Sequence, residues 1–381
     1  MTPKQRMLNA YRGLPNDRPA VAPEFWYYYP AKVLGVDMIQ FEREIPLYRA
    51  LQKTFEKFDC EGWGVVGPSQ ANPHVRGSSR EQWLDADTLE VRYTTHTPKG
   101  DLTHAIRYNR HEPSWVVERG LKDLKRDLTA WELATFGGDP PESADVSGMV
   151  RAWHEVGESY LLEAGIGGTF FDFWAGAREG GYETGVYDFM DPELTPYLER
   201  LQARYIERLV RMASVVCERT PFESLFIGCT WSCLSLLSPD LWRRWDKPVI
   251  QAVADEAHRH GRLLHIHFHG KCMDVVSDFA EMGVDCVCPF ERPPGGDVAG
   301  LDGLRQVERL LRGRTTMNGN LHTVETLERG KPEDVRREVR EILEAFRGNP
   351  RVIVGTGDQV CLHTPEANLQ ALFDEVNRHA A

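Results

Sequence analysis

The stretch Leu263-Leu-His-Ile-His-Phe-His-Gly270 decides the fold that the sequence predicts. Its short apolar run before a glycine is typical of a buried strand in a parallel sheet. Because alternate residues of a strand point to one side, His265, His267 and His269 are expected to converge if the strand continues that far. Core packing does not require imidazoles at a strand end, so the run indicates a ligand or metal site.

Similar short apolar runs recur on both sides of this stretch. They lie at residues 225–228, 284–288, 315–318 and 352–355, with earlier strand candidates near residues 21 and 62. Helical patterns separate them, and residues 195–218 repeat apolar side chains at helical spacing. Strands that recur every ~20–40 residues with helices between them predict βα units and a (β/α)8-type barrel, whose chemistry lies at the carboxyl ends of the strands.

Two regions depart from this rhythm. The first ~60 residues look mainly helical, between punctuated segments at residues 14–19 and 62–64. Residues 88–96 and 102–108 alternate with period two around a Pro-Lys-Gly-Asp turn at 98–101, which predicts a β-hairpin, and residues 115–119 are a candidate third strand. We interpret residues 86–118 as an antiparallel insertion.

Charge and composition exclude several function classes. The 381 residues carry a net charge of −12, which argues against a nucleic-acid binder and against an anionic membrane as partner. No apolar run approaches the ~18 residues of a membrane span, and the start lacks the apolar core of a signal peptide. We therefore expect a cytoplasmic protein, whose eight irregularly spaced cysteines are free thiols or metal ligands rather than disulfides.

Polar residues also follow the three later strands, in residues 289–297, 318–322 and 355–363. Two imidazoles from one strand end and a thiolate from another would make a three-ligand zinc site with an open fourth position, and Cys361 is the best thiolate candidate. The alternative is that the histidines are hydrogen-bonded pocket walls without a metal. Cys229, Cys233, Cys286 and Cys288 are better explained as small buried residues.

Three further features have both a structural and a functional interpretation. Glu291 is either a loop acid or a general acid/base or further metal ligand. Asp358 would contact the substrate or orient a metal-bound histidine. The aromatic run at residues 25–29 is either a buried strand or core plug, or the wall of a pocket for a flat or apolar ligand.

Several motifs in order resemble the uroporphyrinogen decarboxylase superfamily. They lie at residues 237–242, 258–270, 282–285, 291–297, 317–321, 355–358 and 364–369. That superfamily includes porphyrinogen decarboxylases and zinc-dependent methyltransferases that use corrinoid proteins. The resemblance implies one distorted (β/α)8 TIM-type barrel domain over residues 1–381, in which we place residues 1–60 as a helical extension and residues 86–118 as the β-hairpin insertion.

The resemblance also separates the two activities. The decarboxylases carry an arginine-rich amino-terminal motif for the substrate carboxylates, whereas residues 17–27 here hold Arg18 as their single basic residue. The methyltransferases bind zinc through a His-x-Cys pair and a later cysteine. On this pattern His267 matches the histidine, His269 replaces the first cysteine, and Cys361 matches the last.

Our first hypothesis is therefore a zinc-dependent methyltransferase. Zinc on His267, His269 and Cys361 would activate a thiol or similar acceptor, which attacks the methyl group of a methylcorrinoid or related donor. We expect Glu291 to complete the shell or move a proton. The expected substrate-positioning residues are Asp358 and Asn320, and the expected aromatic walls for the cofactor are Trp26, Tyr27 and Trp231.

Two alternatives stay open. One is a metal-free decarboxylase or related lyase acting on a non-porphyrin substrate, in which the histidines and Glu291 manage protons. The other is a non-enzymatic corrinoid-protein-binding or sensory barrel. The expected partners are a small-molecule substrate and a corrinoid protein, and the choice between a monomer and a homodimer stays open.

Overall fold

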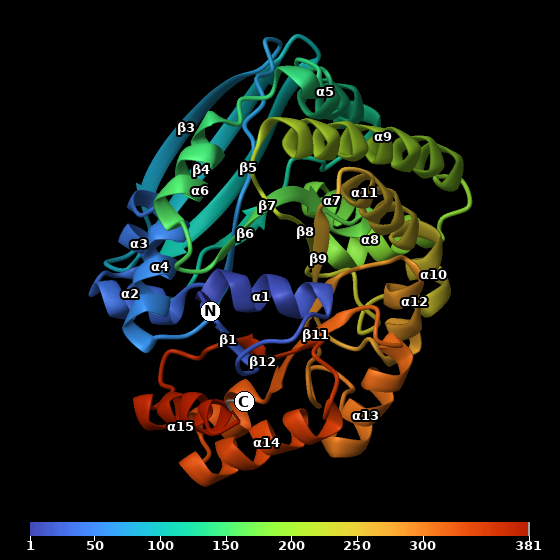
Figure 1. Cartoon of the computed structure of the whole chain (residues 1–381). Coiled ribbons are helices and arrows are strands. Elements are labelled where there is room, and N and C mark those ends of the chain that lie inside the picture. Colours follow the sequence, from blue (N-terminus) through green and yellow to red (C-terminus); the bar gives the residue numbers. More distant parts are fainter. Residues whose placement is uncertain (380–381) are drawn as a thin grey trace.

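The computed structural model describes residues 1–379 and contains an eight-stranded parallel sheet that curls into a barrel (Figure 1). The strand order is β1-β12-β11-β10-β9-β8-β7-β2, and every neighbouring pair is parallel. The strands are β1 (Ala20–Glu24), β2 (Trp63–Val66), β7 (Leu161–Gly168), β8 (Ser224–Cys229), β9 (Leu263–Phe268), β10 (Cys286–Pro289), β11 (Thr316–Leu321) and β12 (Val352–Gln359). The expected distorted (β/α)8-type barrel is confirmed.

Helices connect the strands and cover the outside of the sheet. They are α1 (Pro3–Arg12), α2 (Tyr28–Leu34), α3 (Met38–Glu44), α4 (Leu47–Phe58), α5 (Leu124–Phe136), α6 (Ser147–Val156), α7 (Phe170–Ala177), α8 (Gly181–Met190), α9 (Thr195–Arg219), α10 (Pro239–Trp245), α11 (Lys247–Arg259), α12 (Val276–Glu281), α13 (Gly300–Leu311), α14 (Pro332–Ala345) and α15 (Glu366–Asn377), with short turns η1 (Pro141–Ser143), η2 (Met273–Val275) and η3 (Thr323–Glu328). Helices α1 to α4 form the expected amino-terminal extension, and β1 lies between α1 and α2.

A buried carboxylate connects the two end strands of the sheet, β1 and β2. Glu61, just before β2, is fully buried. It accepts hydrogen bonds from the backbone N–H of Val21 in β1 at 2.8 Å and from both terminal nitrogens of Arg18 at 2.8 Å each. Arg6 of α1 donates a further bond at 3.0 Å. Glu61 therefore connects the amino-terminal extension to β1 and β2, the two end strands of the sheet.

Helix α1 lies across the amino ends of the barrel strands (Figure 1). Thr316, the first residue of β11, donates a hydrogen bond to the carbonyl of Ala10 at 2.7 Å. The buried Tyr11 hydroxyl lies 3.1 Å from Nδ1 of His265 inside the barrel. The amino end is thus filled by α1, which leaves the carboxyl ends for a functional site.

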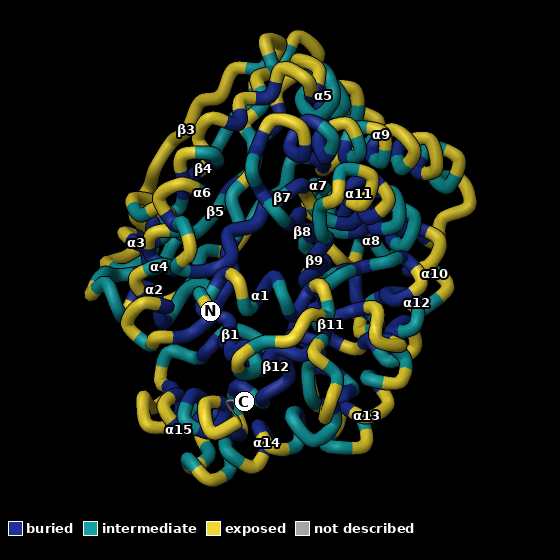
Figure 2. Tube along the Cα trace, viewed as in Figure 1, coloured by how far each residue is buried: buried dark blue, intermediate teal, exposed yellow. Residues whose placement is uncertain are grey.

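The insertion after β2 is larger than the sequence predicted. It is a four-stranded antiparallel sheet of β3 (Arg76–Trp83), β4 (Thr88–Thr97), β5 (Gly100–Asn109) and β6 (Trp115–Glu118). The hairpin and third strand are confirmed, with Leu89 and Val91 of β4 buried. Strand β3 was missed because all its residues are exposed and mostly polar, so it lacks alternation and is held by pairing with β4 (Figure 2).

Most residues of the barrel strands are buried, as the dark central segments of Figure 2 show. Strands buried on both faces need continuous apolar runs, which explains why the sequence predicted them more reliably than β3. Among residues 1–379, we find no helix with the length and apolar character needed to cross a membrane.

Candidate metal centre

Glu24, His267 and His269 meet at the carboxyl ends of β1 and β9. One possible ligand atom from each side chain lies within 4.8 Å of the other two. Among residues 1–379, these three form the one group of three or more His, Cys, Asp or Glu side chains that meets this distance. Oε2 of Glu24 lies 3.3 Å from Nε2 of His267, and the two imidazole rings are 4.3 Å apart. The set of two histidines and one glutamate is a known three-ligand set for catalytic zinc.

Glu291 fixes the orientation of His269. Nδ1 of His269 donates a hydrogen bond to Oε1 of Glu291 at 2.8 Å, and the backbone N–H of Gly270 donates to the same oxygen at 2.7 Å. The ring is therefore held with Nε2 free to act as a ligand. Metal-ligating histidines commonly donate their other ring N–H to a carboxylate in this way.

Burial and mutual charge set the protonation states of the cluster. Burial raises the pKa of Glu24 to about 7; the positive charge of His269 opposes the rise and Glu291 adds to it. Burial and the neighbouring His269 and His265 lower the pKa of His267 well below its ordinary value. Burial alone would lower the pKa of His269, but the bond to Glu291 and the charge of Glu24 raise it to about 9.

One side of the cluster is aromatic. The ring of Trp63 lies 5.4 Å from that of His267, and Trp26 and Phe226 lie 6.4 and 6.1 Å from it. Trp26 and Trp63 also contact each other edge to face at 5.1 Å. Of the predicted aromatic walls, Trp26 is therefore beside the histidines.

The other side is acidic. A cavity of about 280 Å³ is lined by Glu291, Asp358, His322 and Glu325, among others. Burial raises the pKa of Asp358 to about 6, and the nearby Glu24 carboxyl adds to the rise. Burial opposes ionisation of Glu291 too, but the bonds from His269 and Gly270 lower its pKa overall.

The remaining predicted residues lie around the cluster rather than in it. Asn320 is fully buried and donates from Nδ2 to the carbonyl of Val298 at 3.2 Å, which braces the loop that carries Glu291. Tyr27 packs against Phe41 of α3. The half-buried Trp231 packs against Tyr182 of α8. Their roles toward substrate or cofactor stay predictions.

Cys361 lies two residues beyond β12 and is outside the group of three ligand atoms. Burial, with the charges of Glu328 and Asp358, raises the pKa of its thiol to about 11. Glu24, rather than Cys361, is the third side chain of the candidate group. Its position at the end of β1 was the available signal, but the aromatic residues that follow it form the more conspicuous pattern in the sequence.

His265 does not join this cluster, because its ring belongs to a layer deeper in the barrel. Its Nδ1 lies 2.8 Å from Oε2 of Glu163, and its Nε2 lies 3.1 Å from Sγ of Cys288. All three side chains are buried. Of the three alternating histidines, two therefore face the candidate metal centre and one is a core residue.

Zinc affinity is expected to rise with pH. Metal binding must displace the protons that the raised pKa values keep on Glu24 and His269. Below about pH 7, zinc binding releases both protons, so the zinc affinity rises by up to about a hundredfold for each unit of increasing pH. Between about pH 7 and pH 9 one proton is released and the gain is about tenfold per unit. Competition with a chelator across this range measures the slope.

A Glu291→Gln variant provides the control for this titration. Without the Glu291 carboxylate, the pKa of His269 falls and the slope between about pH 7 and pH 9 flattens. A wild-type affinity that is constant or decreases with pH would contradict the ligand assignment.

The chain is thus an α/β-barrel protein with an acid–histidine cluster at its strand ends. The family model described as Uroporphyrinogen decarboxylase (URO-D) matches residues 206–379. A uroporphyrinogen decarboxylase of Paraburkholderia phytofirmans is 26% identical over 164 residues, which are 42% of this chain and 40% of the relative. One of Burkholderia mallei is 32% identical over 89 residues, 23% of this chain and 24% of the relative. The resemblance to the uroporphyrinogen decarboxylase superfamily is confirmed.

These matches span less than half the length of the curated relatives. A solved structure, a methyltransferase from Methanosarcina mazei, shares the fold over 100% of both chains, with a TM-score of 0.65 and 15% identity. The barrel and its extension therefore correspond as a whole to a known architecture.

Proposed function

We propose that the chain is a zinc-dependent methyltransferase that moves a methyl group from a methylcorrinoid or related donor to a thiol or similar acceptor. The observation that carries this proposal is the convergence of Glu24, His267 and His269 at the carboxyl ends of the barrel strands. The likeness in fold to a protein described as a methyltransferase supports the choice of reaction.

The residues present fit a zinc ion. The pKa of His267 lies well below its ordinary value. The ring is therefore neutral, which is the form that binds metal. His269 has Nδ1 engaged with Glu291, so Nε2 is the nitrogen that would bind the metal after loss of its proton. Glu24 supplies a buried carboxyl group, and this burial raises its pKa. Zinc bound there would supply a Lewis acid that lowers the pKa of an acceptor thiol.

The surrounding side chains have separate proposed roles. Glu291 holds His269 in place and is positioned to accept its proton. Trp26, Trp63 and Phe226 exclude water from one side and offer an apolar wall to a methyl group or a flat cofactor. Asp358, at the edge of the acidic cavity, is positioned to bind a polar group of the substrate.

The charges around the cluster favour methyl transfer over decarboxylation of a porphyrinogen. A polyanionic substrate needs a group of cations. Arg18 is engaged with buried Glu61 at the start of β1, so it does not serve the carboxyl-end site. The residues beside the histidines include three carboxyl groups, on Glu24, Glu291 and Asp358.

The experiment combines methylcobalamin with a panel of small thiols and zinc-loaded protein. We expect methylthioether product by mass spectrometry, its loss after chelation, and its return when zinc is added. His267→Ala should form no product, whereas His111→Ala, which replaces an exposed histidine, should match the wild type.

Two outcomes would contradict this proposal. One is the absence of methylated product with every thiol offered. The other is a rate that chelation does not change. Carbon dioxide release from a carboxylate substrate by metal-free protein would favour the lyase alternative instead.

A further inference from the structure

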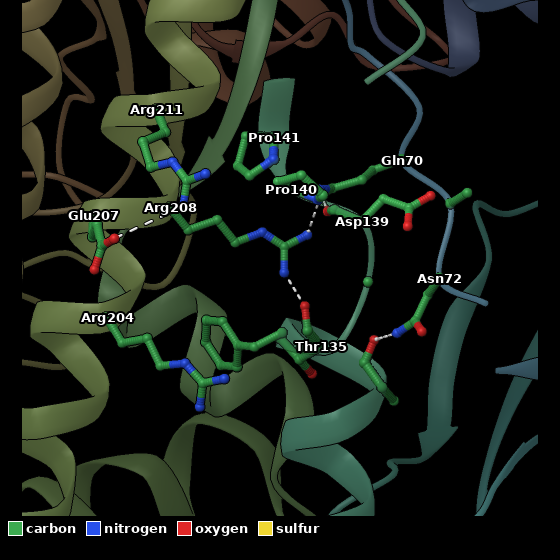
Figure 3. A pocket seen from close by; sticks show the side chains of 14 residues that line it. Gln70, Asn72, Thr135, Asp139, Pro140, Pro141, Arg204, Glu207, Arg208 and Arg211 are labelled. Atoms are coloured by element: carbon green, nitrogen blue, oxygen red, sulfur yellow. Dashed lines mark hydrogen bonds and ion pairs between the residues drawn. The ribbon is translucent and has the colours of Figure 1, made fainter. Parts of the chain in front are cut away.

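A second cavity lies on the outside of the barrel, where α9 passes the end of α5. Its volume is about 360 Å³. Figure 3 shows Arg208 extending across it, between Arg211 and Arg204 of the same helix. The opposite wall comes from residues 70–72 after β2, residues 134–136 at the end of α5 and residues 138–141 before and in η1.

The walls of this cavity are held by hydrogen bonds rather than loosely packed. Nδ2 of Asn72 donates to the carbonyls of Leu133 at 3.0 Å and Ala134 at 2.9 Å, which caps the end of α5. The backbone N–H of Asp139 donates to the carbonyl of Ala71 at 3.1 Å. Hydrogen bonds therefore fix the positions of the segments that form this wall of the cavity.

Two of the three arginines already have a carboxylate partner. Arg211 donates two bonds to Glu142, at 2.9 and 2.7 Å. Arg204 lies 3.4 Å from Glu132, and its guanidinium stacks over the ring of Phe136 at 4.3 Å. Residues 204, 208 and 211 follow helical spacing, so the three side chains share one face of α9.

Arg208 differs because its partners are neutral. It donates to the backbone carbonyl of Thr135 and, at 2.9 Å, to Oε1 of Gln70. Within residues 1–379 we find no carboxylate within 4.0 Å of it. Burial and the charge of Arg204 lower the pKa of its guanidinium, although Tyr205 opposes the change. A half-buried cation without an anion is costly, and a bound anion would relieve that cost.

Two acids line the same cavity and oppose an anion. Glu207 lies 3.8 Å from Arg211 and is largely exposed. Asp139 is exposed at the opposite wall. Because both are solvated, their repulsion is screened more than the attraction of the half-buried Arg208.

We propose that this cavity binds a phosphoryl group, as inorganic phosphate or as a phosphomonoester, through Arg208 with Arg204 and Arg211. A guanidinium has five N–H donors in a planar fork that matches phosphate oxygens, and Arg208 has two of its nitrogens engaged with single carbonyls. The cavity exceeds the size of a phosphate ion, and the ring of Phe136 offers a surface for an organic part.

Binding there would act on the loop that follows β2. Arg208 and Gln70 also line a second hollow of about 420 Å³, with Gly67, Pro68 and residues 165–167 at the carboxyl ends of β2 and β7. A phosphoryl group that takes donors of Arg208 competes with the bond to Gln70. The site is therefore connected to the barrel rim independently of the proposed zinc chemistry.

Calorimetric titration of the full chain with inorganic phosphate and, separately, with ribose 5-phosphate tests the proposal. We expect saturable binding with one site per chain. Arg208→Gln should weaken it by about tenfold or more, as expected for loss of a charged hydrogen-bond donor. Asp139→Asn should tighten it severalfold, a gain that misfolding does not produce. Arg305→Gln on α13 is the matched control and should change the affinity by less than about twofold.

The two ligands distinguish the sources of the phosphoryl group. Equal affinities indicate free phosphate as the ligand, and tighter binding of the ester indicates that the organic part lies in the cavity. The absence of saturable binding by both ligands would overturn the proposal. Equal weakening by Arg208→Gln and Arg305→Gln would also overturn it, because the effect would then reflect net charge.

Discussion

Replacing Glu24 by glutamine is expected to lower zinc affinity by about a hundredfold or more, since loss of an outer-shell partner alone typically costs 10- to 100-fold. In the proposed site Glu24 would bring a negative charge, because the other two candidate ligands are imidazoles. Cys361→Ser is the matched comparison. Because Cys361 lies outside the ligand group, its replacement should change the affinity by less than about threefold.

Competition against a fluorescent zinc chelator at about pH 8 measures both affinities. The reverse pattern, with Cys361→Ser losing zinc and Glu24→Gln retaining it, would restore the ligand set predicted from the sequence. Equal retention by both variants would place the metal elsewhere.

Replacing Glu61 by alanine is expected to lower the free energy of unfolding by about 3–5 kcal/mol, the range for removing one partner of a buried ion pair. The Glu61 side chain is fully buried, and Arg6 and Arg18 are each less than one-sixth exposed. The variant leaves the Arg18 guanidinium and the N–H of Val21 without their carboxylate acceptor, whereas Arg6 keeps its bonds to Asp17. It also removes the connection between the two end strands of the barrel sheet.

Urea unfolding followed by tryptophan fluorescence and far-ultraviolet circular dichroism measures this loss. Glu155→Ala is the control, because Glu155 pairs with Arg49 on the surface. Exposed ion pairs contribute at most about 1 kcal/mol. A Glu61→Ala variant as stable as Glu155→Ala would show that Glu61 does not hold the β1–β2 junction.

The sequence predicted the barrel because its strands are buried on both faces. Residues 263–268 and 352–359 both appear as strands near the expected positions, since short continuous apolar runs between helices are typical of the strands of a parallel sheet. Strand β3 was not predictable in the same way. Its exposed residues carry no burial pattern, and its conformation depends on pairing with β4.

The candidate site was predictable where one strand sets the geometry. His267 and His269 lie two residues apart, so alternation along β9 indicated that they face the same side. Glu24 comes from the other end of the chain, and its approach depends on the curl that places β1 and β9 around one axis. A carboxylate within an apolar pentapeptide gave a weak signal, although its burial now explains its importance.

Cys361 was singled out by its place in the sequence, and its role as a ligand stays a prediction. A cysteine shortly after the last strand lies at the correct end of the barrel, but the chain beyond β12 determines where its thiol points. In the structure it lies near Glu328 and Arg329 at the rim. Order along the sequence thus located the face of the barrel but does not determine the direction of the thiol.

X-ray absorption at the zinc edge tests the central claim most directly, because it reports the ligand atoms of the zinc-loaded protein. We predict a first shell of nitrogen and oxygen at about 2.0–2.2 Å from His267, His269 and Glu24, without sulfur. A sulfur shell at about 2.3 Å would contradict this ligand set and assign Cys361 to the site. Failure of the protein to bind zinc would contradict the proposed function altogether.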